Sequence, residues 1–156
     1  MPNNSPPNRN SSRIIDNVIT LKPISKTDHQ FLYELLAERD PRANISHIKM
    51  PTFQQHVRFV KSKPYSRWYI IKYDDQNAGS IYLTHMNEIG IFLKKEFHGK
   101  NIGKKALNLL MQLNPRERYL ANVNPRNRKS IRFFKKNGFQ LIQYTYEIRK
   151  KKHVVQ

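Results

Sequence analysis

The sequence has no cysteine, and only 11 of its 156 residues are acidic. Without cysteine, disulfide bonds and cysteine-ligated zinc sites are excluded, and the composition suits a cytoplasmic protein without requiring one. No run of about 18 apolar residues occurs, so the sequence predicts no membrane-spanning helix. The start, MPNNSPPNRNSSR, has no apolar stretch of the kind that secretory signals carry. We therefore expect a cytoplasmic protein that does not enter a membrane.

Positive charge is in large excess. The chain carries 29 lysines and arginines, which gives a formal net charge of +18. Such a field attracts nucleic acids, acidic membranes and phosphorylated small molecules alike, so it defines partners only as a class. Length and a hydrophobic content of 38% predict one compact domain. We expect this domain over residues 17–148, between a disordered basic tail at 1–16 and a basic C-terminal tail at 149–156.

The hydrophobic patterns predict strands that alternate with helices. The predicted strands are 18–23, 66–73, 78–84, 88–93 and 118–123, followed by a terminal strand or hairpin over 139–148. The predicted helices begin at Thr27, Thr52, Ile102 and Asn127, and the first two begin with capping boxes, Thr27 with Gln30 and Thr52 with Gln55. This order predicts an α/β fold with a mixed, mostly antiparallel central sheet and about four helices.

The segment 88–113 is the most informative part of the sequence. Its strand alternates apolar residues with Glu88, and its helix is predicted to bury a face formed by Ile102, Ala106, Leu109, Leu110 and Leu113. The turn 98–103 between them leaves the first helical N–H groups unpaired, at the positive end of the helix dipole. Five lysines crowd this turn: Lys94, Lys95, Lys100, Lys104 and Lys105. The segment therefore predicts a site for a polyphosphate.

This segment resembles the acyl-CoA site of the GNAT superfamily of N-acetyltransferases, whose turn carries the pattern Arg/Gln-x-x-Gly-x-Gly/Ala. In this sequence the pattern falls on His98, Asn101 and Gly103. Asn101 departs mildly, because asparagine tolerates a left-handed backbone better than most residues. A second GNAT signature is similar to residues 124–139. The matching residues there are Asn127, Ser130, Phe133, Gly138 and Phe139. The resemblance covers residues 18–148.

The resemblance implies acetyl-CoA as cosubstrate and no metal. Backbone groups of Ile91, Phe92 and Leu93 are expected to bind the pantetheine arm, and Asn127 is expected to contact that arm or simply to cap its helix. The pyrophosphate is expected on the turn residues, which are His98, Gly99, Lys100, Asn101, Ile102, Gly103 and Lys104.

Two residues that many family members use in catalysis are missing. Phe134 stands where a tyrosine would protonate the leaving thiolate, and Asn122 stands where some members have a catalytic glutamate. An amine must still lose a proton before it attacks. Glu88 is our first candidate for the base, although it also fits a surface carboxylate. The other candidates are His85, Tyr144 and Tyr146.

These features lead us to expect an N-acetyltransferase that acts on a primary amine, as a monomer or a homodimer. Positive charge favours an anionic acceptor, such as a nucleotide-linked amino sugar or an acidic peptide N-terminus. The acceptor pocket is expected from residues 41–52 and from the last strands. Two other functions stay open. One is a nucleic-acid- or ribosome-binding protein that uses its basic tails with Tyr65, Trp68 and Tyr69, and the other is an acetyl-CoA sensor without turnover.

Overall fold

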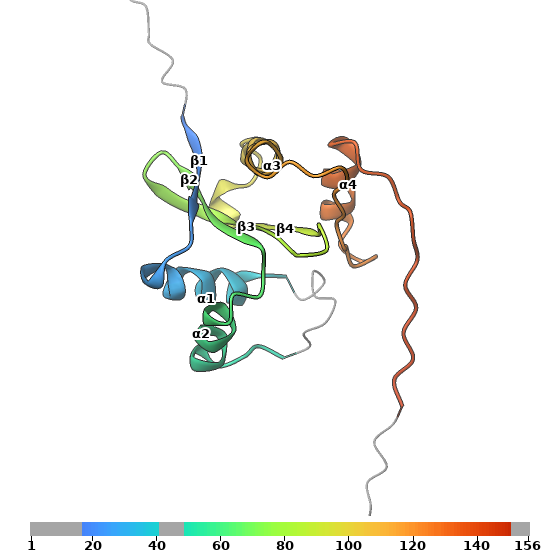
Figure 1. The fold of residues 1–156 in the computed structure, drawn as a ribbon, viewed down its shortest axis with the longest axis horizontal. Coiled ribbons are helices and arrows are strands. Elements are labelled where there is room, and N and C mark those ends of the chain that lie inside the picture. Colours follow the sequence, from blue (N-terminus) through green and yellow to red (C-terminus); the bar gives the residue numbers. More distant parts are fainter. Residues whose placement is uncertain (1–16, 41–48, 151–156) are drawn as a thin grey trace, which may run out of the picture.

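The computed structural model describes residues 17–40 and 49–150 of the chain. A four-stranded antiparallel sheet with the strand order β1-β2-β3-β4 forms its centre (Figure 1). The strands are β1 (Ile19–Pro23), β2 (Arg67–Tyr73), β3 (Gln76–Leu83) and β4 (Ile89–Leu93). The helices are α1 (His29–Glu38), α2 (Phe53–Lys61), α3 (Ile102–Leu113) and α4 (Arg128–Lys136), with short 3₁₀ turns η1 (Lys26–Asp28) and η3 (Lys95–Phe97). The predicted α/β class with a mostly antiparallel sheet is confirmed.

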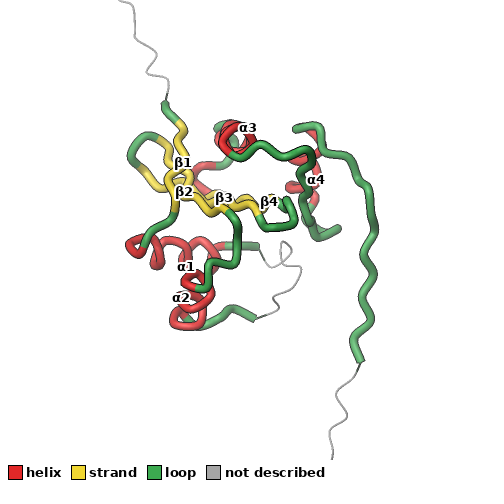
Figure 2. Tube along the Cα trace, in the orientation of Figure 1, coloured by secondary structure: helices red, strands yellow, loops and turns green. Residues whose placement is uncertain are grey.

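Helices cover both faces of this sheet. α3 lies on one face, whereas α1 and α2 lie on the other (Figures 1 and 2). The larger core lies under α3, and it buries Ile71, Ala78, Ile81, Leu83, Ile89, Phe97, Ile102, Ala106, Leu107 and Leu110, among others. A smaller core between the sheet and α1 and α2 is centred on Leu32, Val60 and Ile70. Burial of each such side chain contributes about 1.5–3 kcal/mol, so the α3 face dominates the packing energy.

The pairing of β3 with β4 decides which side chains share a face. Ser80 pairs with Phe92 and Tyr82 with Gly90 on one face, and Ile81 pairs with Ile91 and Leu83 with Ile89 on the other. Because side chains alternate along a strand, the isoleucines and leucines enter the core under α3. Tyr82 and Phe92 consequently project toward the α1–α2 side. One face of β4 therefore contributes aliphatic side chains to the core under α3, whereas the other face carries aromatic side chains on the α1–α2 side.

Helix α3 has the predicted bounds but not quite the predicted buried face. Ile102, Ala106 and Leu110 are buried, whereas Leu113 is 58% exposed. The next buried residue on this face of the helix is instead Asn114, four residues after Leu110. The Asn114 amide donates to the Leu110 carbonyl at 3.0 Å and to the Tyr69 hydroxyl at 3.2 Å. The Asn114 side chain can be buried at this helix end because its amide group is hydrogen-bonded.

The first predicted capping box is wrong and the second is confirmed. Thr27 and Gln30 do not begin α1. Instead, Ser25 and Asp28 form a reciprocal box at η1. The Asp28 carboxylate accepts from the Ser25 amide at 2.7 Å and from Lys22 Nζ at 2.9 Å. These charge-assisted hydrogen bonds favour the box of Ser25 with Asp28 over the predicted box of Thr27 with Gln30. At α2, Thr52 and Gln55 form the predicted box.

Two predicted strands are absent from the described part of the chain. Residues 118–123 contribute a single parallel bridge, between Leu120 and Glu88, and residues 139–148 belong to no strand. The chain from 141 to 150 runs away from the domain in an extended form and is exposed throughout (Figure 1). The predicted tail 1–16 lies outside the described residues, as do 41–48 and 151–156. Among the described helices, none combines the length and the hydropathy that a membrane span requires.

Candidate functional site

The turn between β4 and α3 has the backbone form that the sequence predicted. Gly99 and Asn101 both have positive φ, at +76° and +61°, and Asn101 is the left-handed N-cap of α3. Phe97 in the preceding η3 is buried and anchors the turn in the core. Glycine and asparagine are the residues that adopt this conformation at least cost, so the turn is built from residues suited to it.

The amides of this turn point away from the protein's own acceptors. Within the described residues, none of the backbone N–H groups from Gly99 to Lys104 donates to a protein atom, and the first bond belongs to Lys105, whose N–H lies 3.3 Å from the Asn101 carbonyl. Unpaired amides at a helix N-terminus bind anions, and the helix dipole adds positive potential there. The turn therefore has a row of backbone donors without a protein acceptor.

His98 ties this turn to two other elements. Its Nε2 lies 3.0 Å from the carbonyl oxygen of Leu93 in β4, and its Nδ1 lies 2.6 Å from Nζ of Lys129 in α4. Lysine only donates, so Nδ1 accepts and Nε2–H donates to Leu93. The contact brings a further cation, Lys129, to the turn through His98. Sequence reasoning missed Lys129, because its proximity to the turn arises only in the folded chain.

The outer edge of β4 lies open next to this turn. The Ile89 amide donates to the Leu120 carbonyl at 2.7 Å, which shows that Ile89 directs its backbone groups away from β3. Alternation then directs the backbone groups of Ile91 and Leu93 to the same side. In the described chain, no strand pairs with β4 at these residues. An extended molecule can therefore form backbone hydrogen bonds to Ile91 and Leu93.

Glu88 lies at the start of this edge and is held by two side chains. Its Oε1 accepts from the Asn122 amide at 2.9 Å, and its Oε2 accepts from the Thr84 hydroxyl at 3.2 Å. The Glu88 backbone N–H also donates to Thr84 Oγ1 at 3.0 Å. The carboxylate is half-buried, and its charge acts on the Tyr82 hydroxyl. Glu88 thus has a defined orientation next to the open edge.

A cation packed against aromatic rings lies on the same side of β4 as Glu88. The Arg39 guanidinium carbon lies 4.3 Å from the centroid of the Phe92 ring. Tyr65 and Tyr82 stack at 3.9 Å between centroids with an interplanar angle of 5°. Tyr82 covers Gly90, where a β-carbon would meet its ring at 2.1 Å. We call Arg39, Tyr65, Tyr82 and Phe92 the Arg39 cluster.

Burial sets the charge state of the Arg39 cluster. Burial raises the pKa of the Tyr65 and Tyr82 hydroxyls, so both remain protonated donors at neutral pH. Burial also lowers the pKa of Arg39 from its usual value, but arginine remains charged in proteins. The cluster therefore supplies donors and a positive charge, whereas neighbouring Glu88 supplies a negative charge. Sequence reasoning missed Arg39 and Tyr82, since neither belongs to a local motif.

The remaining predicted site residues lie in different surroundings. Asn127 caps α4 by accepting from the Ser130 amide at 3.1 Å. Phe134 is a buried aromatic whose ring lies between those of Phe133 and Phe139. Tyr144 and Tyr146 are 74% and 90% exposed on the extended C-terminal segment, so the structure does not bring them to Glu88.

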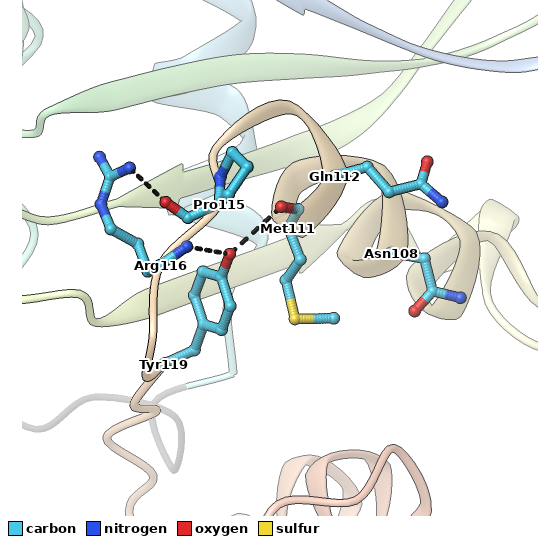
Figure 3. Close-up of a pocket in the computed structure, with 6 residues that line it drawn as sticks. All are labelled: Asn108, Met111, Gln112, Pro115, Arg116 and Tyr119. Carbon is cyan, nitrogen blue, oxygen red and sulfur yellow. Dashed lines mark hydrogen bonds between the residues drawn. The ribbon is translucent and has the colours of Figure 1, made fainter.

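A surface hollow lies at the opposite end of α3 from the turn (Figure 3). It is lined by Asn108, Met111, Gln112, Pro115, Arg116 and Tyr119. The Tyr119 hydroxyl accepts from the Arg116 amide at 2.9 Å and donates to the Asn114 carbonyl at 2.7 Å. These bonds close the loop after α3, so the hollow is part of a structural turn and does not belong to the site. No metal-binding group of three or more His, Asp or Glu side chains occurs among the described residues.

The chain is similar in sequence profile and in fold to known proteins. The sequence profile of the "Acetyltransferase (GNAT) domain" matches residues 19–140. No curated protein sequence matches the chain. A solved domain from Methanocaldococcus jannaschii has a TM-score of 0.71 at 22% identity, covering 85% of this chain and 94% of its own.

Two further structures have named activities. A ribosomal alpha-N-protein acetyltransferase in complex with coenzyme A has a TM-score of 0.65 at 17% identity, covering 80% of this chain and 81% of its own. A dodecameric spermidine N-acetyltransferase from Vibrio cholerae has a TM-score of 0.62 at 17% identity, with coverages of 78% and 79%. Each of these likenesses concerns the fold.

Proposed function

Since the chain belongs to the GNAT acetyltransferase family, we propose that it moves the acetyl group of acetyl-CoA to a primary amine on an anionic acceptor. The observation that carries this proposal is the row of unpaired amides from Gly99 to Lys104 beside the open edge of β4. A diphosphate fits the first feature, and an extended amide-containing arm fits the second. Acetyl-CoA has both groups in one molecule.

The residues assigned to acetyl-CoA follow from these two features. The diphosphate would accept from the turn amides, with Lys104 and Lys129 adding charge. The pantetheine arm would lie along β4 as an added strand, bonded to Ile91 and to the N–H of Leu93. The Leu93 carbonyl already accepts from His98, so His98 positions the turn and needs no direct contact with phosphate. Asn127 keeps its role as the N-cap of α4.

Glu88 is the group best placed to take the amine's proton. The ammonium proton passes to Glu88, and the C–N bond then forms as the C–S bond breaks. The second nitrogen proton reaches the leaving thiolate through water, because Phe134 has no hydroxyl to supply one. A positioned base of this kind contributes typically about 10²–10⁴-fold to the rate. Thr84 and Asn122 orient the carboxylate for this transfer.

The Arg39 cluster supports an acceptor that carries a negative charge. Arg39 stacks on Phe92, and its guanidinium adds a positive charge on this side of β4. The Tyr65 hydroxyl donates to that of Tyr82, and the protonated Tyr82 hydroxyl adds a donor on the same side. With Glu88 on the same side of β4, the site suits a molecule that has an ammonium group and a carboxylate or phosphate. A nucleotide-linked amino sugar or an acidic peptide N-terminus has this chemistry.

Two measurements test the proposal. We expect acetyl-CoA and coenzyme A each to raise the melting temperature, since ligands that bind only the folded state stabilise it. Thiol release is then followed with pairs of amines that differ only in an anionic group, and the anionic member of each pair should react faster. The proposal fails if neither thioester nor thiol stabilises the protein, particularly if nucleic acid binds with steep salt dependence instead. Stabilisation without thiol release from any amine would indicate a sensor.

A further inference from the structure

Helix α4 carries a group of exposed cations that the acetyl-CoA site does not account for. In the described chain none of them forms an ion pair, and they are Arg128, Lys129, Arg132, Lys135 and Lys136. The sequence has no acidic residue between Glu117 and Glu147. The charge of α4 is therefore not neutralised by neighbours along the chain. We call these five residues the α4 stripe.

The α4 stripe lies on one side of its helix. At about 100° per residue, the five positions fall within an arc of about 120°. Phe134 stands on the opposite side of the helix and is buried, so the stripe faces away from the domain. Along the helix axis the charges form three groups, at 128–129, 132 and 135–136, whose centres are about 5 Å apart. The stripe is thus a straight row of positive charge.

This arrangement is unfavourable for an isolated helix. Like charges three or four residues apart repel one another, and Arg132 has such neighbours in both directions along α4. Arg128 and Lys129 stand in the first turn, where the helix dipole favours anions, and that turn has no acidic residue. Departures from local rules are expected where a surface has a function. A bound polyanion would remove both kinds of repulsion.

The exposed side of α4 favours a nucleic acid over a membrane or a single small anion. Its exposed residues are all lysine or arginine. Helices that bind a membrane surface insert an apolar face into it, but the Phe134 side of α4 is turned into the domain. A small anion needs one charge group, whereas three groups in line match the repeated phosphates of a nucleic-acid strand. The chemistry of the stripe therefore fits a phosphate backbone.

The α4 stripe begins beside the turn between β4 and α3 and extends beyond it. Lys129 Nζ lies 2.6 Å from Nδ1 of His98 in that turn. Lys135 and Lys136 stand about 9–10 Å further along the helix axis. A diphosphate on the turn amides would therefore use only the first part of the stripe. The remaining cations are available to another ligand.

We propose that the α4 stripe binds the phosphate backbone of a nucleic-acid strand, outside the acetyl-CoA site. Each charge group meets phosphate oxygens, and the release of counterions from the strand drives the association. Lysine and arginine contacts to phosphates carry no sequence information, so the binding is tolerant of sequence. The net charge of +18 steers the strand toward the protein. This surface acts whether or not the chain transfers acetyl groups.

The test measures binding of the full chain to a short single-stranded RNA of mixed sequence, by fluorescence anisotropy across a series of salt concentrations. One variant combines Arg132→Gln, Lys135→Gln and Lys136→Gln and keeps Lys129. Loss of three phosphate contacts should make the slope of log affinity against log salt shallower by about 2, and affinity at about 100 mM salt should fall about hundredfold. Glutamine is a good helix former, so α4 should remain intact.

The matched control removes three exposed cations from the other face of the sheet. It combines Lys26→Gln in η1 with Arg58→Gln and Lys61→Gln in α2, and α2 lies apart from α4 (Figure 1). Because exposed charges beyond a Debye length are largely screened, this control should lose less than about fivefold in affinity. Equal losses in the two triple variants would overturn the proposal, since net charge alone would then explain the binding.

Two further comparisons separate the backbone of a nucleic acid from other ligands. A DNA strand of the same sequence should bind within about threefold of the RNA, because the contacts go to phosphates. Vesicles of phosphatidylcholine with phosphatidylserine should bind more weakly than the RNA. Absence of RNA binding, tighter binding to the vesicles, or a preference above about tenfold for one base sequence would overturn the proposal.

Acetyl-CoA provides the readout that keeps this proposal separate from acetyl transfer. It should raise the melting temperature of the α4 variant as much as that of the unmodified chain, because the turn and Lys129 are unchanged. Loss of RNA binding with full stabilisation by acetyl-CoA is the expected result for this variant. Loss of both together would overturn the proposal of a surface outside the acetyl-CoA site.

Discussion

The side-chain amide of Asn122 donates a hydrogen bond of 2.9 Å to Oε1 of Glu88. The residue at the position that the family resemblance associates with a glutamate therefore orients a glutamate contributed by another segment. Glu88 directly precedes β4 and Asn122 lies in the loop after α3, and the bridge between Glu88 and Leu120 brings these segments together. In our proposal Glu88 therefore supplies the carboxylate that the resemblance would lead one to expect at position 122.

Replacement of Glu88 should test this proton transfer directly. Glu88→Gln keeps the size of the side chain but removes the base, so we expect the rate at neutral pH to fall about 10²–10⁴-fold. The rate should recover partly at high pH, where the amine is already neutral. Thiol release against pH measures this change, and acetyl-CoA affinity, measured by calorimetry, should stay the same. Full activity of Glu88→Gln across the pH range would show that Glu88 is not the base.

The charge beside the turn should affect acetyl-CoA through its diphosphate. Lys104 is exposed in the first turn of α3, and Lys104→Glu places a like charge beside the phosphates. We expect acetyl-CoA affinity to fall about tenfold, measured by calorimetry at low salt. Lys61→Glu at the end of α2 changes the net charge equally and should have little effect. Acetyl-pantetheine, which lacks the diphosphate, should not distinguish the two variants.

Arg39 should affect the acceptor rather than acetyl-CoA. Arg39→Gln removes the cation beside Phe92, and we expect the KM for an anionic amine to rise about 10–100-fold with a smaller change in kcat. The KM for an uncharged amine should change little. Arg58→Gln, on the exposed side of α2, is the matched control. Equal losses for charged and uncharged amines would show that Arg39 supports the structure only.

His56 should make stability depend on pH. It is buried in α2 against Tyr33 and Phe59, and its Nδ1 has no hydrogen-bond partner in the described chain. Burial, followed by the charge of His29, lowers the pKa of His56 below its usual 6.5. The unfolded chain therefore takes up this proton first, and stability that is complete above about pH 6.5 falls as the pH drops.

The size of this effect is limited by one proton. His56 should contribute a slope of up to about 1.4 kcal/mol per pH unit to the free energy of unfolding between pH 6.5 and its folded pKa. Urea unfolding at a series of pH values measures the slope, and His56→Leu should remove it. His85→Gln in the exposed turn before β4 is the control. An unchanged slope in His56→Leu would assign the pH dependence to other groups.

Local features were predictable from the sequence because their determinants are close together. The box of Thr52 with Gln55, the bounds of α3 and the left-handed Asn101 each depend on interactions within a few residues. The amide row was predictable for the same reason. The two capping boxes near η1 have the same local form, however. Lys22, six residues before Asp28 and in β1, donates to the Asp28 carboxylate and so favours the box that forms.

The features that the sequence did not reveal depend on distant residues. Residues 118–123 and 139–148 have strand-like patterns, but a strand also needs an edge to pair with, and the pattern does not say where that edge is. Arg39 and Phe92 are far apart in the chain, and no local signal joins them. The cytoplasmic location and the two tails stay predictions.

The contact between Gly103 and α4 has a consequence for how this protein can change. A methyl group on Gly103 would lie 3.0 Å from Cε2 of Phe133, so one added carbon would force the ring to shift. The absence of a β-carbon at Gly103 and the size of the Phe133 ring thus together set the spacing between α3 and α4. Gly103→Ala alone should strain the contact between these helices, while Gly103→Ala combined with Phe133→Leu should remove that strain. The two positions are expected to evolve as a pair.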